Sequence, residues 1–214
     1  MTGQPTITRR SSNVEWERSA VTVVERCGSR VQGGATLWFT GLSGCGKSAI
    51  ARATERLLLV RHGRCAYVLD GDNLRHGLNG DLGFDAADRS ENVRRVGEVA
   101  LLLADAGLVA IASLISPFAA DRERVGTRHA DAGLPFFEIF VDTPIATCEA
   151  RDSKGLYARA RAGEIVGFTG VDHPYEAPVH PALRIVPSDG TPLDAAERVI
   201  ALLGHPDPAP APSS

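Results

Sequence analysis

The sequence predicts an α/β fold in which helices flank a doubly wound parallel sheet. Short apolar runs alternate with longer helical patterns from about residue 34 onward, as expected where crossover helices join parallel strands. The first apolar run leads into a glycine-rich loop, and a helical pattern follows at once. With 43% hydrophobic and 23% charged residues among 214, the composition is that of one ordinary globular domain.

The elements can be placed from these patterns. Strands are expected at 35–40, 65–70, 108–113, 136–141 and 183–186. Helices are expected at 47–62, from 88 to about 106, from about 121, after Pro144 and at 194–203. The second helix is placed at residue 88 because Asp88-x-x-Glu91 has the form of a capping box, with Asp in place of Ser or Thr.

The chain divides into a polar arm at 1–33, a main domain at 34–204 and a Pro/Ala-rich tail at 205–214, which is expected to be disordered. Within the main domain, residues 151–181 are rich in Gly, Pro and charge. That is too long for a simple connection, and such segments are usually lids or disordered. The apolar stretch at 99–115 is interrupted by Asp105 and Gly107, so it predicts a helix and a buried strand, not a membrane span.

Charge and cysteine usage exclude several classes of partner. A net charge of −3 is unsuited to a broad nucleic-acid surface. The four cysteines are widely spaced without a CxxC pair, so neither a zinc site nor a disulfide framework is indicated. The polar N-terminus has no apolar secretory segment, and a cytoplasmic protein is expected.

Residues 41–48 match G-x-x-x-x-G-K-[ST] and predict a P-loop. The glycines let backbone N–H groups surround the β-phosphate of a nucleotide, and the positive end of the next helix adds to the attraction. Lys47 is expected to reach the β- and γ-phosphates of ATP, and the Ser48 hydroxyl to bind Mg²⁺. The nucleotide-binding residues are Gly41, Leu42, Ser43, Gly44, Cys45, Gly46, Lys47 and Ser48. The alternative, a turn that binds nothing, is disfavoured by the strand before the loop and the helix after it.

Two carboxylates, Asp70 and Asp72, follow the second predicted strand. In an open parallel sheet, ligands bind outside the carboxyl ends of the strands. Asp70 is therefore assigned to Mg²⁺ and Asp72 to orienting an attacking hydroxyl, although a solvated Asp-Gly-Asp-Asn turn is the alternative. The chain has no N-K-x-D motif for reading guanine, which disfavours a GTPase.

Longer segments resemble the adenosine 5′-phosphosulfate (APS) kinases, a family of P-loop kinases. These segments span about residues 12–186 and lie at 12–16, 69–79, 81–84, 89–98, 115–117, 121–122, 151–157, 161–164, 168–170 and 172–178. The resemblance implies a P-loop NTPase-type fold with a mobile lid, and transfer of the γ-phosphoryl group of ATP to the 3′-hydroxyl of APS. It also implies a homodimer that acts in sulfate activation.

The resemblance assigns APS binding to Arg75, Phe84, Arg89, Asn92, Lys154 and Phe168. Guanidinium forks suit the oxygens of a phosphosulfate, and an aromatic ring offers an adenine a flat apolar face. Taken singly, each arginine could instead form a surface ion pair, and Phe84 could pack in the core. The catalytic residues assigned are Lys47, Asp72, Ser116 and Lys154.

Residues 151–170 resemble the lid of the family, with glycines as hinges and several positive charges. A lid of this kind excludes water, which competes with the acceptor hydroxyl for the phosphoryl group. The alternative is a basic loop that stays solvated.

The resemblance further implies that Ser116 is phosphorylated as an intermediate. A serine nucleophile needs an adjacent base, and the sequence identifies none near it. Direct transfer is therefore predicted, with Ser116 opening a turn before Pro117 and shaping the APS pocket.

Four positions depart from the family pattern: Ala49 replaces Thr, Ala119 replaces Arg, Ser153 replaces Pro and Glu17 replaces His. These four differences are expected to affect substrate affinity and turnover rate more than the kind of reaction. Two other functions stay open, a P-loop kinase for another small hydroxylated acceptor and a nucleotide-binding relative without catalytic activity.

Overall fold

The computed structural model describes residues 33–186 and 190–204, and its centre is a five-stranded parallel sheet. The strands are β1 (Ala35–Thr40), β2 (Ala66–Asp70), β3 (Val109–Ser113), β4 (Phe136–Val141) and β5 (Leu183–Ile185). Their order across the sheet is β2-β3-β1-β4-β5, so β1 is central. Each strand lies within one residue of its predicted bounds.

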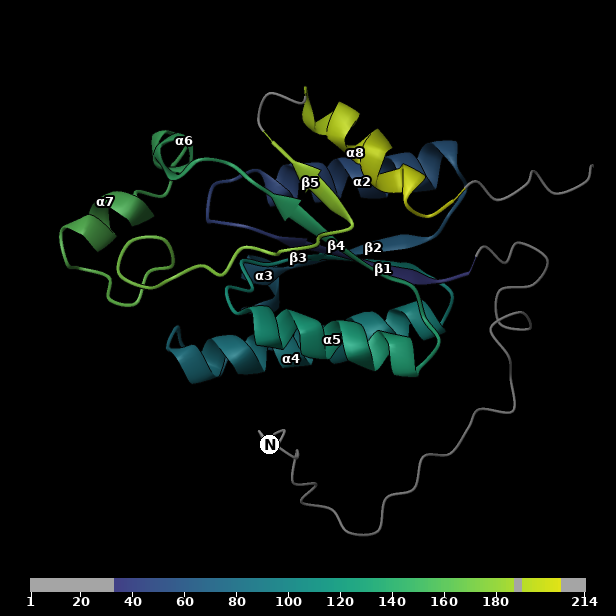
Figure 1. Cartoon of the computed structure of the whole chain (residues 1–214), viewed down its shortest axis with the longest axis horizontal. Helices are drawn as coiled ribbons and strands as arrows, with labels where there is room; N and C mark the ends of the chain where they lie inside the picture. The colour runs from purple at the N-terminus through teal and green to yellow at the C-terminus, as the bar shows by residue number, and fades with distance from the viewer. Residues whose placement is uncertain (1–32, 187–189, 205–214) are drawn as a thin grey trace, which may run out of the picture.

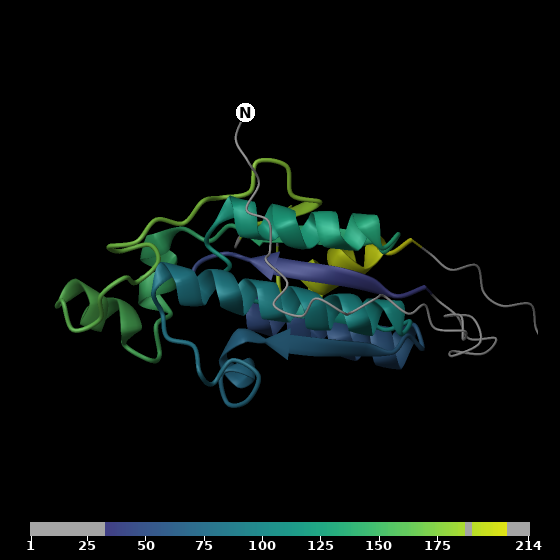
Figure 2. The ribbon, with the colours of Figure 1, turned by 90° about the horizontal axis from the view of Figure 1, so that it is seen from below.

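Helices cover both faces of this sheet, which confirms the doubly wound α/β prediction (Figure 1). α2 (Lys47–Arg61) and α8 (Pro192–Ala201) lie on one face, and α4 (Ala86–Asp105) and α5 (Ala119–Asp131) on the other. Two short helices, α6 (Ile145–Ala150) and α7 (Leu156–Arg161), lie beyond one end of the sheet, as Figure 2 shows from below. In the described residues, no helix is both long and apolar enough to cross a bilayer.

The core divides into two layers because side chains alternate along β1. Leu37 and Phe39 pack on the side of α2 and α8, whereas Trp38 packs on the side of α4 and α5. All three side chains are fully buried. A strand with both faces covered reads as a continuous apolar run, which is why it was recognisable in the sequence.

The strand register brings the ends of three strands to one level. Phe39 of β1 and Asp70 of β2 are both paired with Ser113 of β3. The P-loop therefore starts beside the last residues of β2 and β3, at the edge where parallel sheets bind their ligands.

The expected start of α4 at Asp88 is wrong. The helix begins at Ala86, and the side chain of Asp85 caps it by accepting the N–H of Asp88 at 2.8 Å. Asp88 instead accepts the N–H of Gly83 at 2.7 Å, and Glu91 binds arginines. Asp85 and Asp88 both suit a cap by residue type, and only the path of the preceding loop decides between them.

Other boundaries differ less. α5 begins at Ala119, two residues before the expected start, and α8 runs from Pro192 to Ala201 behind a Thr191–Asp194 capping box. Two helices were not expected: α3 (Gly71–Leu74), where a turn was the alternative, and α7 inside the lid. The arm apart from its last residue, the tail and the resemblance at 12–16, with Glu17, lie outside the described residues.

Replacing Asp85 by Ala removes the cap of α4, so we expect the free energy of unfolding to fall by about 1 kcal/mol. The melting temperature should fall by about 2–4 °C for a domain of this size. Denaturant and thermal unfolding measure both effects. Asp85→Asn should restore most of the loss, whereas Glu123→Ala, at an exposed site on α5, is the neutral control. A melting temperature unchanged in Asp85→Ala would contradict the assignment of this cap.

Candidate functional site

A cleft with a volume of about 280 Å³ opens at the carboxyl ends of β1, β2 and β3. It is walled by the P-loop, by residues that follow β2 and β3, by α4 and by the start of the lid. Most residues predicted from separate motifs meet in it: Ser43, Gly44, Lys47, Ser48, Asp70, Asp72, Arg75, Phe84, Arg89, Asn92, Ser116 and Lys154.

The P-loop follows β1 and ends where α2 begins at Lys47. Two of its glycines are required by close packing as well as by backbone conformation. A Cβ on Gly41, where φ is 146°, would lie 2.6 Å from the Val141 carbonyl oxygen, and one on Gly44 would lie 3.0 Å from that of Cys148. The loop can therefore bend tightly just before the N-terminus of α2, whose positive end suits a phosphate.

Lys47 is buried inside this loop. Its Nζ donates to the carbonyl oxygens of Gly41 at 2.9 Å and Leu42 at 2.7 Å, and lies 3.4 Å from the Cys45 sulfur. The ammonium group thus sits where the loop would surround a phosphate. Its flexible stem lets it exchange these neutral carbonyls for phosphate oxygens.

Ser48 and Asp70, both predicted to bind Mg²⁺, contact each other. The Ser48 hydroxyl donates to Asp70 Oδ2 at 2.7 Å and lies 3.3 Å from the Ser113 hydroxyl. The other carboxylate oxygen of Asp70 accepts the N–H of Asp72 at 3.1 Å and so caps α3. This fixes the carboxylate in orientation, and an all-oxygen donor set of this kind fits Mg²⁺.

Arg75 and Phe84 form one side of the cleft. The guanidinium carbon of Arg75 lies 4.1 Å from the centroid of the Phe84 ring. Burial lowers the pKa of Arg75, although Asp72 and Asp88 oppose that shift. The Phe84 side chain is 62% exposed, so it is not a core residue and its ring remains free to stack with a ligand.

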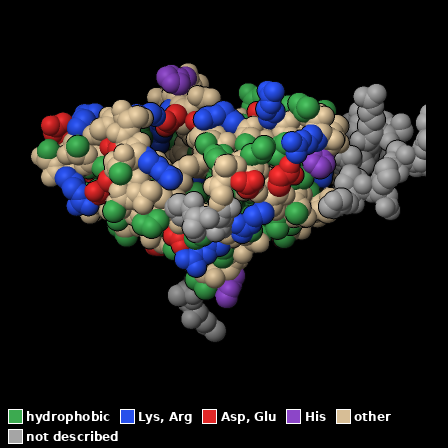
Figure 3. All heavy atoms as spheres, turned by 90° about the horizontal axis from the view of Figure 1, so that it is seen from above, with side chains coloured by type: hydrophobic (Ala, Val, Ile, Leu, Met, Phe, Trp, Pro, Cys, Tyr) green, Lys and Arg blue, Asp and Glu red, His purple; other side chains and the backbone are tan. Residues whose placement is uncertain are grey.

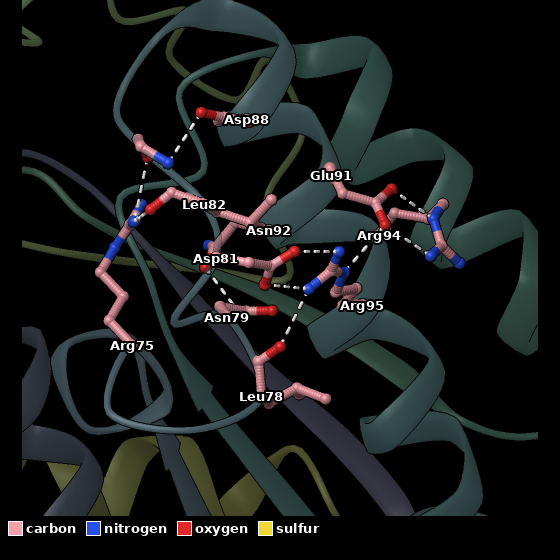
Figure 4. A network of polar contacts seen from close by, with 11 residues as sticks. Arg75, Leu78, Asn79, Asp81, Leu82, Asp88, Glu91, Asn92, Arg94 and Arg95 are labelled. Carbon is pink, nitrogen blue, oxygen red and sulfur yellow. Dashed lines mark hydrogen bonds and ion pairs between the residues drawn. The ribbon is translucent and has the colours of Figure 1, made fainter.

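The loop that carries Phe84 is fastened to α4 by a polar network (Figure 4). Arg95 binds both carboxylate oxygens of Asp81, at 2.7 and 2.9 Å, and also reaches Glu91. The Asn79 amide donates to Asn92 Oδ1 at 2.8 Å. Hydrogen bonds from Arg94 and then Arg95 lower the pKa of Glu91 to about 2, so Glu91 stays ionised at every physiological pH.

Arg89 is buried and links α4 to the lid. Its guanidinium donates to the carbonyl oxygens of Phe84 at 2.7 Å and Gly167 at 2.6 Å, and to the Thr169 hydroxyl. Burial lowers its pKa, and repulsion from Arg75 adds to the effect. The alternative of a surface ion pair is therefore wrong for Arg89, because its described partners are uncharged oxygens.

Lys154 and Tyr157 connect the lid to the body, and a ring contact between Tyr157 and Phe168 lies within the lid. Lys154 forms an ion pair with Asp72, which raises the pKa of Lys154. The Tyr157 hydroxyl donates to the Ser43 carbonyl at 2.9 Å, and the Tyr157 ring packs edge-on against Phe168 with centroids 5.0 Å apart. Phe168, predicted to bind APS, is thus 9% exposed within the core and does not line the cleft.

Ser116 lies in the cleft wall, but its hydroxyl is engaged in the interior. Ser116 Oγ accepts the indole N–H of Trp38 at 3.1 Å and donates to the Thr40 hydroxyl at 3.0 Å. The residue is 3% exposed, and its backbone has φ of 40°, which is uncommon for any residue other than glycine.

A second cavity, of about 340 Å³, borders the P-loop on the side of β5 and α8. Gly46, Ala49, Arg151, Ile185 and Thr191 are among its lining residues. Sequence reasoning missed this cavity, because its walls come from four segments that carry no shared motif. The one available signal was Ala49, which departs from the family pattern.

On the face shown in Figure 3, Lys and Arg side chains are interspersed with Asp and Glu and form no continuous basic area. Within residues 33–186 and 190–204, no group of three or more His, Cys, Asp or Glu side chains is placed to hold a metal ion.

The family model described as adenylylsulphate kinase matches residues 33–186. The chain is 50% identical over 192 residues to an adenylyl-sulfate kinase of Marinobacter nauticus, covering 90% of this chain and 95% of the relative. It is 55% identical over 193 residues to the bifunctional enzyme CysN/CysC of Mycobacterium tuberculosis, covering 90% of this chain and 30% of that longer protein.

Solved structures agree with this. The structure of the Mycobacterium tuberculosis APS kinase CysC in complex with AMPPNP and APS superposes with a TM-score of 0.78 at 57% sequence identity. The match covers 81% of this chain and 99% of that one.

Proposed function

The chain belongs to the adenylylsulphate kinase family, and we propose that it transfers the γ-phosphoryl group of ATP to the 3′-hydroxyl of APS, giving 3′-phosphoadenosine 5′-phosphosulfate (PAPS) and ADP. The main support for this proposal is that one cleft is lined both by the P-loop and by the arginines and aromatic ring of the predicted acceptor site. The P-loop residues would bind the phosphates of ATP. The second cavity, on the other side of that loop, is placed to take the adenosine of ATP.

The acceptor enters from the side of Arg75 and Phe84. Phe84 offers its exposed ring to the adenine, and the neighbouring guanidinium groups attract the phosphosulfate oxygens. Asn92 lies in the same wall, held by Asn79. This combination favours an acceptor with both a flat base and a strong anion over a neutral sugar.

Transfer is a direct in-line displacement. A bond forms between the 3′-oxygen and the γ-phosphorus as the bond from that phosphorus to the β,γ-bridging oxygen breaks, and Asp72 receives the hydroxyl proton. Lys47 compensates the negative charge that moves toward the β-phosphate. Ser48 and Asp70 would hold Mg²⁺, which neutralises phosphate charge.

Ser116 shapes the cleft wall and is not phosphorylated during the transfer. Its hydroxyl already accepts one hydrogen bond and donates another within the interior. Phosphorylation would remove the proton that Ser116 donates to Thr40, and it is unnecessary where ATP and acceptor meet in one cleft.

The test of this function is ADP release by the purified chain with ATP and APS, compared with a panel of nucleosides and sugar acids. Preference for APS supports the proposal. Preference for another acceptor favours the alternative kinase, and ATP binding without turnover favours a non-catalytic relative. A cytoplasmic location, expected from the sequence, and a homodimer, implied by the family resemblance, are part of the proposal and are tested by fractionation and by ultracentrifugation.

Arg89→Ala should raise the KM for APS far more than that for ATP, because Arg89 faces the acceptor side of the cleft and anchors lid residues 167–169. Steady-state kinetics with each substrate varied in turn measure this split. Arg94→Ala, on the exposed side of the same helix, is the control. Equal losses for both substrates would place the acceptor site elsewhere.

Lys154→Ala should increase ATP hydrolysis relative to transfer, because the lid loses its ion pair with Asp72 and admits water. The ratio of ADP to PAPS formed reports the leak. Arg159→Ala removes a lid charge that pairs instead with exposed Glu164, and it should leave the ratio unchanged. A ratio of ADP to PAPS that stays at the wild-type value in Lys154→Ala would contradict the lid assignment.

Ser116→Ala should keep a substantial fraction of kcat, because transfer is direct. ATP made chiral at the γ-phosphorus should yield a product with inverted configuration. Retention of configuration, or a folded alanine variant that binds both substrates without turnover, would show that a phosphoserine intermediate exists.

A further inference from the structure

Thr40, the last residue of β1, carries a hydroxyl at the junction of the P-loop, the acceptor wall and the end of the lid. It is completely buried and immediately precedes Gly41. Its oxygen lies 2.7 Å from the Ile115 carbonyl, 3.0 Å from the Ser116 hydroxyl and 2.9 Å from the Tyr175 hydroxyl. These three partners belong to two segments, 115–116 and 175, that are both far from Thr40 in the sequence.

The direction of each hydrogen bond follows from counting protons. A hydroxyl has one proton to donate and two lone pairs that accept. The Ile115 carbonyl can only accept, so Thr40 donates its proton there. Ser116 and Tyr175 must then both donate to Thr40, which leaves the Thr40 hydroxyl fully satisfied.

This network holds the backbone of the cleft wall in an unfavourable conformation. Ser116 has φ of 40°, a conformation that costs free energy and persists only where surrounding contacts impose it. Those contacts are the Trp38 indole, which donates to Ser116 Oγ, and Thr40. The wall at 115–117 is therefore shaped from inside the protein, not from the cleft.

Arg122 of α5 ties the same wall to the same end of the lid. It is 2% exposed, and it donates to the carbonyl oxygens of Ser116 and Glu176, both at 2.7 Å. Its Nε donates to Glu138 at 2.6 Å, which supplies the compensating charge. In addition, the N–H of Glu176 donates to the Pro117 carbonyl at 2.9 Å.

We propose that Thr40, Tyr175 and Arg122 are positioning residues that make the acceptor wall at 115–117 and the downstream end of the lid at 175–176 one mechanical unit. Lid and wall then adopt the APS-binding geometry together, while the ATP side of the P-loop does not depend on the linkage. This inference rests on the proposed function for its substrate. It extends that function by assigning roles to residues outside the reacting atoms.

The first test uses Tyr175→Phe and Thr40→Val, which remove one hydroxyl each and keep the shape of the side chain. Tyr175→Phe loses one buried hydrogen bond and Thr40→Val loses three. The KM for APS should therefore rise roughly fivefold in Tyr175→Phe and at least as much in Thr40→Val, while the KM for ATP changes by less than about twofold. Thr40→Ser keeps the hydroxyl and should restore the KM for APS. Arg128→Gln, at an exposed site on α5 where the arginine pairs with exposed Glu98, is the matched control.

A purely structural role would instead reduce stability and change both KM values equally, and that outcome overturns the proposal. Arg122→Lys serves in place of an alanine variant that would leave the partly buried Glu138 carboxylate without its Arg122 partner. It keeps the charge but cannot reach both carbonyl oxygens, so the KM for APS should again rise selectively.

Amide hydrogen exchange separates failure of this linkage from failure of the proposed substrate. Exchange at 115–119 and at 176 should increase together in Tyr175→Phe without any ligand, whether or not APS proves to be the acceptor. Unchanged exchange at 115–119 in Tyr175→Phe would overturn the linkage, even if the wild-type chain phosphorylates APS. If the wild-type protein does not phosphorylate APS, but exchange at 115–119 and at 176 still increases together in Tyr175→Phe, only the proposed substrate is overturned.

Discussion

Because all five strands run in the same direction, their carboxyl ends meet at one edge of the sheet, and every part of the site depends on this constraint. β1 ends at Thr40 and leads into the P-loop, β2 ends at Asp70, and β3 ends at Ser113. The contacts of Ser48 with Asp70 and Ser113 follow from that geometry, although 22 and 65 positions separate these residues in the chain. Motifs that are separate in the sequence thus line one cleft.

Two buried arginines use the same chemistry to hold the segment at 167–176. Arg89 donates to oxygens at 167 and 169, and Arg122 donates to the carbonyl oxygen at 176. A guanidinium stays protonated even when burial opposes the charge, and its rigid fork can bridge two backbone segments at once. Lysine could supply the charge but not the bridge. The two lysines of the chain, Lys47 and Lys154, are flexible point charges, which suits the exchange of partners that the proposed reaction requires of them.

Some assignments followed from sequence because a local requirement determined them. The five strands and the P-loop were placed correctly, since continuous apolar runs and a glycine pattern report burial and backbone conformation directly. The start of α4 was misplaced, because Asp85 and Asp88 are equally suited to a cap until the loop before them is folded. Phe84 and Phe168 show the same limit. Both are aromatic residues in family motifs, yet one is exposed in the cleft and the other packs on Tyr157.

The sequence by itself determined the α/β class, the nucleotide-binding loop and the family, because these depend on short segments whose residue types have few other uses. Only the tertiary structure decided what the polar side chains contact. It turned the Ser116 hydroxyl inward to Thr40, fixed Arg89 to uncharged oxygens of the lid and opened the second cavity beside Ala49. Hydrogen bonds depend on atoms within about 3 Å of each other, and residues distant in sequence reach that separation only after the strands and helices have packed.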